Sequence, residues 1–150
     1  MSGDRERVAG LAVVATARTW IGTPYRHQAS RKGVGADCLG LVRGVYAEVT
    51  GQAIPRPAPY SADWAERAGG ERLIEAARLH CLPVAAGNEI PGDIIIFRWQ
   101  PQAAAKHAGI LSGEGRFIHA YEQAGVIESP LTPGWARRIA ALFRIPTRSF

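Results

Sequence analysis

A cysteine stands at the point where a helix is expected to begin. Cys38 follows Asp37, a favoured N-cap residue, and Gly51 is a favoured residue just past a helix end. Apolar residues recur on one helical face at i+3, i+4, i+7 and i+11 from the cysteine: Leu41, Val42, Val45 and Val49. This spacing predicts a helix over Cys38–Thr50. A thiol in its first turn faces the positive end of the helix dipole, which favours the thiolate, so the pattern is typical of a cysteine nucleophile.

Two of the four histidines could supply the base that such a nucleophile needs. His107 and His119 each lie in a short apolar run bounded by turn residues, which predicts two β-strands. The residues between these runs, Ser112–Gly115, predict a tight hairpin connection. Antiparallel pairing would bring the two imidazoles together, so that one acts as general base and the other orients its ring. The other two, His27 and His80, are expected at the surface or at a helix end.

A cysteine in an apolar helix is more often a core residue than a nucleophile, and it is the histidine pair that favours catalysis by Cys38. The second cysteine, Cys81, follows a predicted helix over Glu71–His80 and is expected to be a small buried hydrophobe. A disulfide between the two would disable the nucleophile, so we expect free thiols. His80 and Cys81 have no second pair of ligands, so the sequence predicts neither a metal site nor a cofactor.

The secondary-structure elements that position the cysteine and the two histidines are predicted as helices first and strands after them along the chain. A first helix is predicted over Asp4–Trp20, and one or two more between Ser61 and His80, after a proline-rich connection at 54–59. Strands are predicted over Asp93–Trp99, His107–Leu111, Arg116–Tyr121, Gly125–Ser129 and Arg137–Arg144. This order predicts a single domain over residues 1–150 with an α+β fold, in which N-terminal helices pack on an antiparallel sheet of about five or six strands.

Four short motifs in this order resemble the NlpC family of bacterial cell-wall cysteine peptidases, which have a reduced papain-like fold. The family's Asp-Cys-Ser-Gly-Leu motif appears as Asp37-Cys38-Leu39-Gly40-Leu41, and its Pro-Gly-Asp-Leu motif as Pro91-Gly92-Asp93-Ile94. Its His-Val-Gly-Ile strand appears as His107-Ala108-Gly109-Ile110, and its Ile-His-Ala strand as Ile118-His119-Ala120. With Gly22-Thr23-Pro24-Tyr25 ahead of the cysteine, the resemblance covers about Trp20 to Phe143.

The resemblance implies a catalytic role for three residues: Cys38 as nucleophile, His107 as base and His119 as the third, orienting residue. It implies that Tyr25 lies near the nucleophile and helps to bind the substrate or the oxyanion. It also implies that Asp37, beside the cysteine, helps to hold the peptide amine of the substrate.

One position departs from the family pattern. Leu39 replaces the usual serine after the cysteine and cannot donate a side-chain hydrogen bond, which leaves the reaction class intact but puts the substrate in doubt. The basic, polar segment between Tyr25 and Cys38 begins with Arg26, and we expect it to hold a carboxylate of the substrate.

The activity that the resemblance implies is hydrolysis of peptidoglycan stem peptides through a thioester, typically between D-glutamate and diaminopimelate or lysine, with no cofactor. One alternative is an acyltransferase or amidase on the same scaffold, although the lipid-acting enzymes of that kind place their histidine before the cysteine. The other is a non-catalytic structural or nucleic-acid-binding module that keeps the fold.

The amino-acid composition indicates which classes of binding partner to expect. The net charge is +5, and of the 18 basic residues only two are lysines, a balance that favours polyanions such as the cell wall. Neither a nucleic-acid-binding motif nor a transmembrane run of about 18 apolar residues is visible. The charged start of the chain does not read as a signal peptide. We therefore expect cytoplasmic synthesis, action at the cell wall, and delivery by a virion-like particle with phage-type tail proteins as partners.

Overall fold

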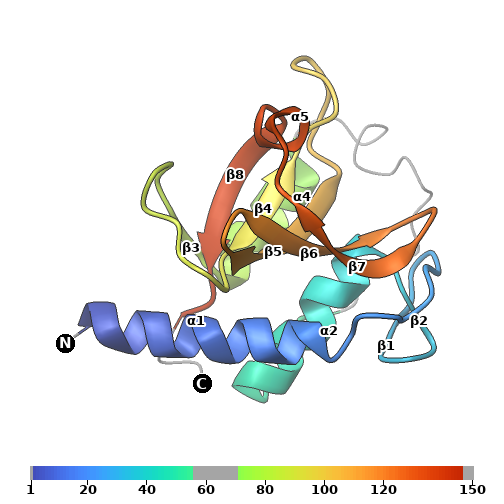
Figure 1. Ribbon diagram of the computed structural model, residues 1–150, viewed down its shortest axis with the longest axis horizontal. Coiled ribbons are helices and arrows are strands. Elements are labelled where there is room, and N and C mark those ends of the chain that lie inside the picture. The colour runs from blue at the N-terminus through green and yellow to red at the C-terminus, as the bar shows by residue number, and fades with distance from the viewer. Residues whose placement is uncertain (1, 56–70, 147–150) are drawn as a thin grey trace.

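Helices precede most strands along the chain, as the sequence pattern predicts (Figure 1). A computed structural model describes residues 2–55 and 71–146. The predicted proline-rich connection and the predicted helical region from Ser61 therefore fall largely outside the described residues. Within them lie the helices α1 (Ser2–Arg18), α2 (Cys38–Thr50), α4 (Arg72–His80) and α5 (Pro133–Ala136).

The strands form one large antiparallel sheet and one small ribbon. The large sheet has six strands in the spatial order β3-β8-β4-β5-β6-β7. These are β3 (Leu82–Pro83), β4 (Ile94–Phe97), β5 (His107–Gly113), β6 (Arg116–Tyr121), β7 (Gly125–Pro130) and β8 (Ile139–Arg144). The ribbon pairs β1 (Ser30–Arg31) with β2 (Gly35–Ala36) ahead of α2. The fold is α+β with helices on an antiparallel sheet, which confirms the predicted class.

Some boundaries differ from the sequence prediction. The helix α1 ends at Arg18 rather than Trp20, because the N–H groups of Thr19 and Trp20 bond to carbonyls three residues back and close a turn. The strand expected from Arg137 begins at Ile139, because the Arg137 N–H closes the last turn of α5. Neither α5 nor β3 is predicted from the sequence, since elements this short show no hydrophobic period.

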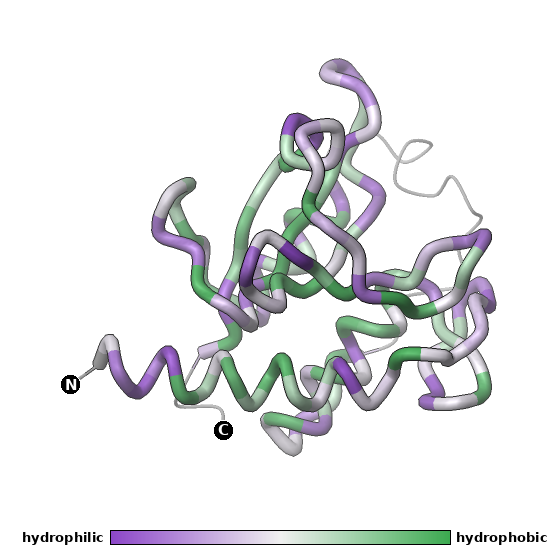
Figure 2. The backbone as a smooth tube through the Cα atoms, in the orientation of Figure 1, coloured by the Kyte–Doolittle hydropathy of each residue, from purple (hydrophilic) through white to green (hydrophobic). Residues whose placement is uncertain are grey.

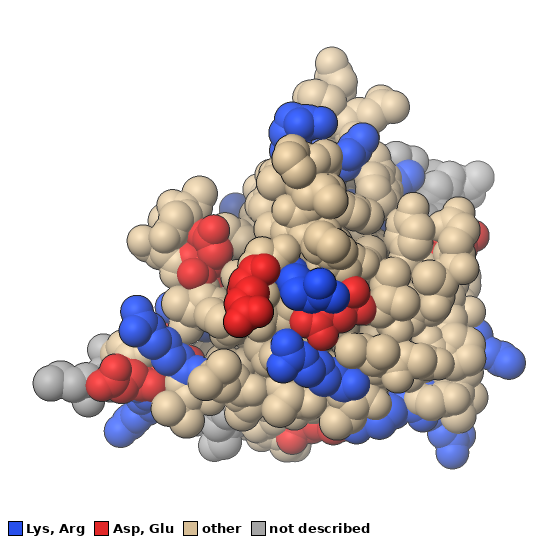
Figure 3. Space-filling view, in the orientation of Figure 1, with Lys and Arg blue, Asp and Glu red and all other residues tan. Residues whose placement is uncertain are grey.

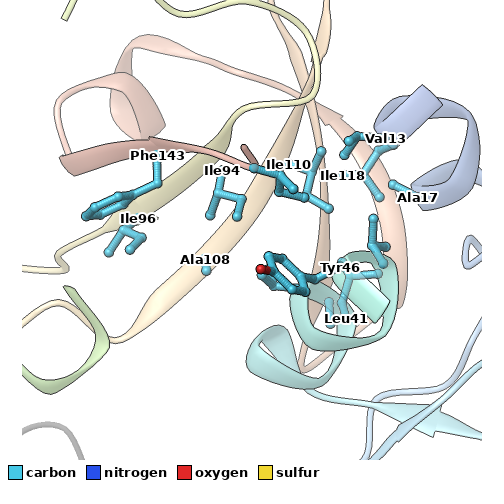
Figure 4. Packing of buried hydrophobic residues seen from close by; sticks show 14 of the residues in the cluster. Val13, Ala17, Leu41, Tyr46, Ile94, Ile96, Ala108, Ile110, Ile118 and Phe143 are labelled. Carbon is cyan, nitrogen blue, oxygen red and sulfur yellow. The ribbon is translucent and has the colours of Figure 1, made fainter. Parts of the chain in front are cut away.

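The sheet carries a different apolar core on each face. The first, larger core joins α1, α2 and α4 to the sheet, and Figure 4 shows part of it, including Val13, Leu41, Tyr46, Ile96, Ile110 and Ile118. The second core, on the other face, consists of Ile95, Phe97, Phe117 and Leu142, with Trp135 of α5 packed against it. Hydrophobic residues accordingly run along the central strands, while the outer turns are mostly hydrophilic (Figure 2).

Strand alternation puts the two candidate histidines on the α5 face. In β5, Ala108 belongs to the helix-facing core, so its neighbour His107 points to the opposite side. In β6, Ile118 belongs to the same core, so His119 also points away from the helices. Phe97, which pairs with His107 across β4 and β5, belongs to the second core and confirms this assignment. Both imidazoles therefore lie on one side of the sheet.

The surface shows mixed charge and no membrane-spanning element. On the face seen in Figure 3, acidic and basic side chains are interspersed and form no continuous basic patch. Among the ion pairs of the surface, Arg18 and Arg116 both pair with Glu128. Within the described ranges, no helix is long and apolar enough to cross a membrane.

Candidate active site

Cys38 is the first residue of α2, as the sequence predicts. The Asp37 carboxylate accepts the N–H of Gly40 at 2.7 Å through Oδ1, which is the N-cap bond, and the N–H of Gln28 at 2.7 Å through Oδ2. At the other end Gly51 adopts φ +73° and closes the helix on the Ala47 carbonyl. The helix bounds Cys38–Thr50 are those predicted, because both ends are set by local signals.

Gly40 lets the preceding loop pack directly on the first turn of α2. A Cβ at this position would collide with the backbone carbonyl oxygen of Ala29. The loop is further fixed by the Ser30 hydroxyl, which donates to the Gly40 carbonyl at 2.7 Å, and by the Asp37 N–H, which donates to Ala29 at 3.2 Å. The glycine two positions after the cysteine therefore has a structural role: without a Cβ, it lets the loop before α2 pack against the start of the helix.

We expect Gly40→Ala to destabilise the protein by about 3 kcal/mol, because the new methyl group meets backbone that has to move. The measurement is chemical unfolding at neutral pH. Gly3→Ala is the matched control: it also adds a methyl group to a helical glycine, but within 4 Å of that Cβ there is nothing, so its stability should stay within about 1 kcal/mol of native. Equal effects of the two substitutions would contradict this account of the motif.

The hairpin brings the two histidine rings into direct contact. His107 Nε2 lies 2.9 Å from His119 Nδ1, and His119 Nε2 lies 3.0 Å from the hydroxyl of Ser129 in β7. The register that achieves this pairs Gly109 with His119, and a Cβ at Gly109 would approach the Ile118 carbonyl to 2.9 Å. A glycine in the His-Ala-Gly-Ile strand thus permits the close strand contact beside the histidine pair.

Aromatic side chains surround the histidine pair. The centroid of the His107 ring lies 5.5 Å from that of Trp99, in a stacked arrangement, and 5.6 Å from that of Trp135. The ring centroids of Phe117 and His119 are 4.2 Å apart. His107 is 6% exposed and His119 1%. Burial lowers the pKa of His119 to about 4, and burial together with the smaller effect of the nearby His119 ring lowers the pKa of His107 to about 3. Both histidines are neutral at pH 7.

The depressed histidine pKa values predict acid sensitivity of the fold. Between pH 6.5 and about 4 the unfolded chain binds protons at these histidines that the folded chain does not, so stability falls as the pH falls. At pH 5 the loss is about 2 kcal/mol for each histidine. Urea unfolding at pH 7 and pH 5 measures it, and His119→Asn should shrink the difference between the two pH values by about that amount. An unchanged difference would contradict the assignment.

Cys38 and His107 line the same cavity, which has a volume of about 440 Å³. The other lining residues are Tyr25, Trp99, Lys106, Ala120, Tyr121, Glu122 and Gln123. In this arrangement Cys38 Sγ lies 3.8 Å from the carbonyl oxygen of Lys106, the residue before His107. The thiol therefore donates toward the backbone.

The resting thiol is protonated, contrary to the thiolate that the helix start favours. Burial, which is the larger cause, and the adjacent Asp37 carboxylate together raise the pKa of Cys38 to about 12. Backbone N–H groups of Ala108, Leu39 and Cys38 itself act in the opposite direction but do not compensate. The site therefore rests as a neutral thiol beside a neutral imidazole, and deprotonation has to be coupled to attack on a substrate.

Tyr25 reaches the cavity on a short extended segment. Its neighbours Pro24 and Arg26 exchange backbone hydrogen bonds with Ala36, so that Tyr25 forms a parallel bridge with that residue. Burial, followed by the negative charge of a Cys38 thiolate, raises the pKa of Tyr25 to about 12, so its hydroxyl stays protonated and can donate a hydrogen bond.

Two predicted substrate contacts lie elsewhere. Asp37 is 3% exposed and its carboxylate accepts backbone N–H groups, while the stem of the exposed Arg26 packs over Gly35; neither lines the cavity. Their roles in binding stay predictions.

The remaining features concern the second thiol, the metal prediction and the residues missed from the sequence. Cys81 is buried and, like Cys38, forms no disulfide. Among residues 2–55 and 71–146, no three histidine, cysteine or acidic side chains gather as a metal site would require. Ser129 is not predicted from the sequence, because only the β6–β7 register places it beside His119. Trp99 and Trp135 are expected from the sequence to be packing or groove-wall residues, and both rings lie against His107.

Comparison with known proteins gives consistent matches. Residues 22–144 match the NlpC/P60 family. Gamma-DL-glutamyl hydrolase of Bacillus subtilis is 34% identical over 137 residues, covering 91% of this chain and 29% of that protein. Murein DD-endopeptidase MepS/murein LD-carboxypeptidase of Escherichia coli K12 is 30% identical over 131 residues, covering 87% of this chain and 60% of that protein. The chain thus spans less than two thirds of the length of these relatives.

Solved structures share the fold. An NlpC/P60 family protein from Bacillus cereus superposes with a TM-score of 0.65 at 26% identity, over 91% of this chain and 40% of that one. The NlpC/p60 domain of the peptidoglycan hydrolase SagA superposes with a TM-score of 0.63 at 26% identity, over 91% of this chain and 98% of that one.

Proposed function

Because this chain belongs to the NlpC/P60 family, a family of peptidoglycan hydrolases and endopeptidases, we propose that it is a cysteine endopeptidase acting on peptidoglycan stem peptides. The observation that carries the proposal is the single cavity lined by both Cys38 and His107, with His119 at 2.9 Å behind the imidazole. That order of thiol, base and orienting group is the arrangement of a nucleophilic acyl-transfer site.

In the proposed reaction, His107 takes the thiol proton as Cys38 attacks the peptide carbonyl. The imidazole is uncharged at neutral pH, so one of its ring nitrogens can accept the proton. Because the pKa of His107 is lowered and that of Cys38 is raised, this transfer has to accompany the attack on the carbonyl. The amine leaves with the proton from His107 and a thioester remains on Cys38. Water, deprotonated by the same imidazole, then releases the acid and restores the thiol.

The negative oxygen of the tetrahedral intermediate needs donors in the cavity. The backbone N–H at the start of α2 is one candidate, and the protonated hydroxyl of Tyr25 is the other. Each such donor contributes on the order of 3 kcal/mol to lowering the barrier. Tyr25 thereby has a role in the chemical step rather than in binding alone.

The bond we propose is the one between D-glutamate and diaminopimelate or lysine. The name of the Bacillus relative specifies a glutamyl linkage, whereas that of the Escherichia relative specifies a murein DD-bond and an LD-carboxypeptidase activity, so the relatives do not agree on one bond. Delivery by a phage-type tail particle and cytoplasmic synthesis stay predictions from the sequence.

The experiment that tests the proposed function is digestion of purified peptidoglycan, with the released fragments identified by mass spectrometry. Walls containing diaminopimelate and walls containing lysine are digested in parallel, together with a γ-linked glutamyl polymer. Fragments ending at D-glutamate from either wall support the proposal. Release from the glutamyl polymer alone would make the substrate a γ-glutamyl chain, and release from none of the three would overturn the hydrolase assignment in favour of an acyltransferase.

A further inference from the structure

A third side chain extends the hydrogen-bonded chain beyond the two histidines. His107 Nε2 meets His119 Nδ1 at 2.9 Å, and His119 Nε2 meets the Ser129 hydroxyl oxygen at 3.0 Å. Ser129 lies in β7, the edge strand of the sheet, opposite Phe117 of β6. The connected groups therefore cross three neighbouring strands.

The free nitrogen of His107 identifies the atom that has to act as base. Its Nε2 is occupied by His119, and within the described residues its Nδ1 makes no hydrogen bond. Within these ranges, every buried side-chain nitrogen or oxygen has a hydrogen-bond partner. Since Nδ1 has none, it cannot be buried, and it must be open to the cavity that His107 lines with Cys38. Nδ1 can accept a proton only in the tautomer that carries hydrogen on Nε2.

That tautomer of His107 fixes which atom donates in each hydrogen bond of the chain His107–His119–Ser129. With hydrogen on Nε2, His107 donates to His119 Nδ1, which has to be bare. His119 then carries its own hydrogen on Nε2 and donates to Ser129, whose hydroxyl oxygen has to accept. If Ser129 donated instead, every hydrogen would reverse, His107 would carry hydrogen on Nδ1, and the base would be blocked.

Ser129 is able to accept because its own proton has somewhere to go. The residue is partly exposed, and within the described ranges its side chain makes no other hydrogen bond, so the hydroxyl hydrogen can point to solvent. We propose that Ser129 is a positioning residue: by accepting from His119 it holds His107 in the tautomer whose Nδ1 faces the nucleophile. The kinetic part of this proposal rests on the proposed hydrolase function, but the tautomer part does not.

Removing the Ser129 hydroxyl should reverse the direction of donation between the two histidines. In Ser129→Ala, a hydrogen on His119 Nε2 would face a methyl group, and a buried N–H without an acceptor is less well tolerated than a bare acceptor. The hydrogen therefore moves to Nδ1 of His119, and His107 takes its own hydrogen on Nδ1. Ser129→Thr keeps the hydroxyl in a β-strand, where threonine is well accommodated, and should retain the native arrangement.

The first test is nitrogen NMR of the imidazole rings in the native protein and the Ser129 variants. We expect hydrogen on Nε2 of both His107 and His119 in the native protein and in Ser129→Thr, and hydrogen on Nδ1 of both in Ser129→Ala. Native His107 with hydrogen on Nδ1, or tautomers that do not change in Ser129→Ala, would overturn the proposal. This readout needs no substrate, so it stands even where hydrolysis fails.

The second test is steady-state hydrolysis of a purified stem peptide. Ser129→Ala should lower kcat about tenfold with little change in KM, and Ser129→Thr should restore it. Ser112→Ala is the matched control: it removes another serine hydroxyl from the same sheet, from a buried residue whose hydroxyl bonds to Glu128 and not to a histidine. Equal loss of kcat in Ser112→Ala and Ser129→Ala would mark a structural effect and overturn the assigned role.

Discussion

Cys38→Ala is expected to lower hydrolysis of stem peptides by at least about a thousandfold, because Cys38 carries the only thiol among the described residues that line the cavity. The fold should survive, since the Asp37 cap of α2 remains. The measurement is the rate of peptide release at neutral pH, with a thermal melt of the same preparation.

Cys81→Ala is the matched control for this prediction. Cys81 is buried in the larger core at the end of α4 and does not line the cavity. Its truncation should lower the melting temperature but leave the rate per folded molecule unchanged. A Cys38→Ala variant that retains even a tenth of the native rate would contradict a nucleophilic cysteine.

His107→Gln is expected to lower kcat by about a thousandfold, because glutamine cannot take the thiol proton at any accessible pH. Without this base almost no thiolate forms, since the pKa of the resting thiol is raised to about 12. The expected rate of the variant rises with pH, as direct ionisation of the thiol replaces transfer to the imidazole.

His80→Gln controls for the loss of a histidine as such. His80 ends α4, and its ring makes an edge contact with Tyr46 in the core rather than with any cavity residue. Hydrolysis by this variant should match that of the native protein. Should His107→Gln retain a rate near native at pH 7, another group would have to be the base.

The helix α2, which begins at Cys38, is the part of the molecule that local sequence determines best. Asp37 and Gly51 set its two ends through their own backbone and side-chain geometry, so the predicted bounds match the structure. The contact between His107 and His119 could also be predicted from the sequence, because strand alternation and a tight connection leave one register that keeps the apolar residues buried. The connection is shorter than the predicted Ser112–Gly115, because β5 continues to Gly113, which pairs with Arg116.

Other features depend on contacts between distant segments and leave no local pattern. Trp135 reaches the histidines only because the four-residue helix α5 folds back over the sheet. Ser129 bonds to His119 only because of the β6–β7 register. The pKa of the thiol depends on how deeply the loops bury it, and that depth outweighed the helix-dipole effect visible in the sequence.

The most direct test of the central claim is intact-mass analysis of the protein quenched with acid during turnover of a stem peptide. A thioester on Cys38 predicts a mass increase equal to the acyl part of the substrate, located on the fragment that contains Cys38 and absent from Cys38→Ala. Turnover with no adduct on Cys38, or an adduct that persists in Cys38→Ala, would contradict cysteine catalysis by this site.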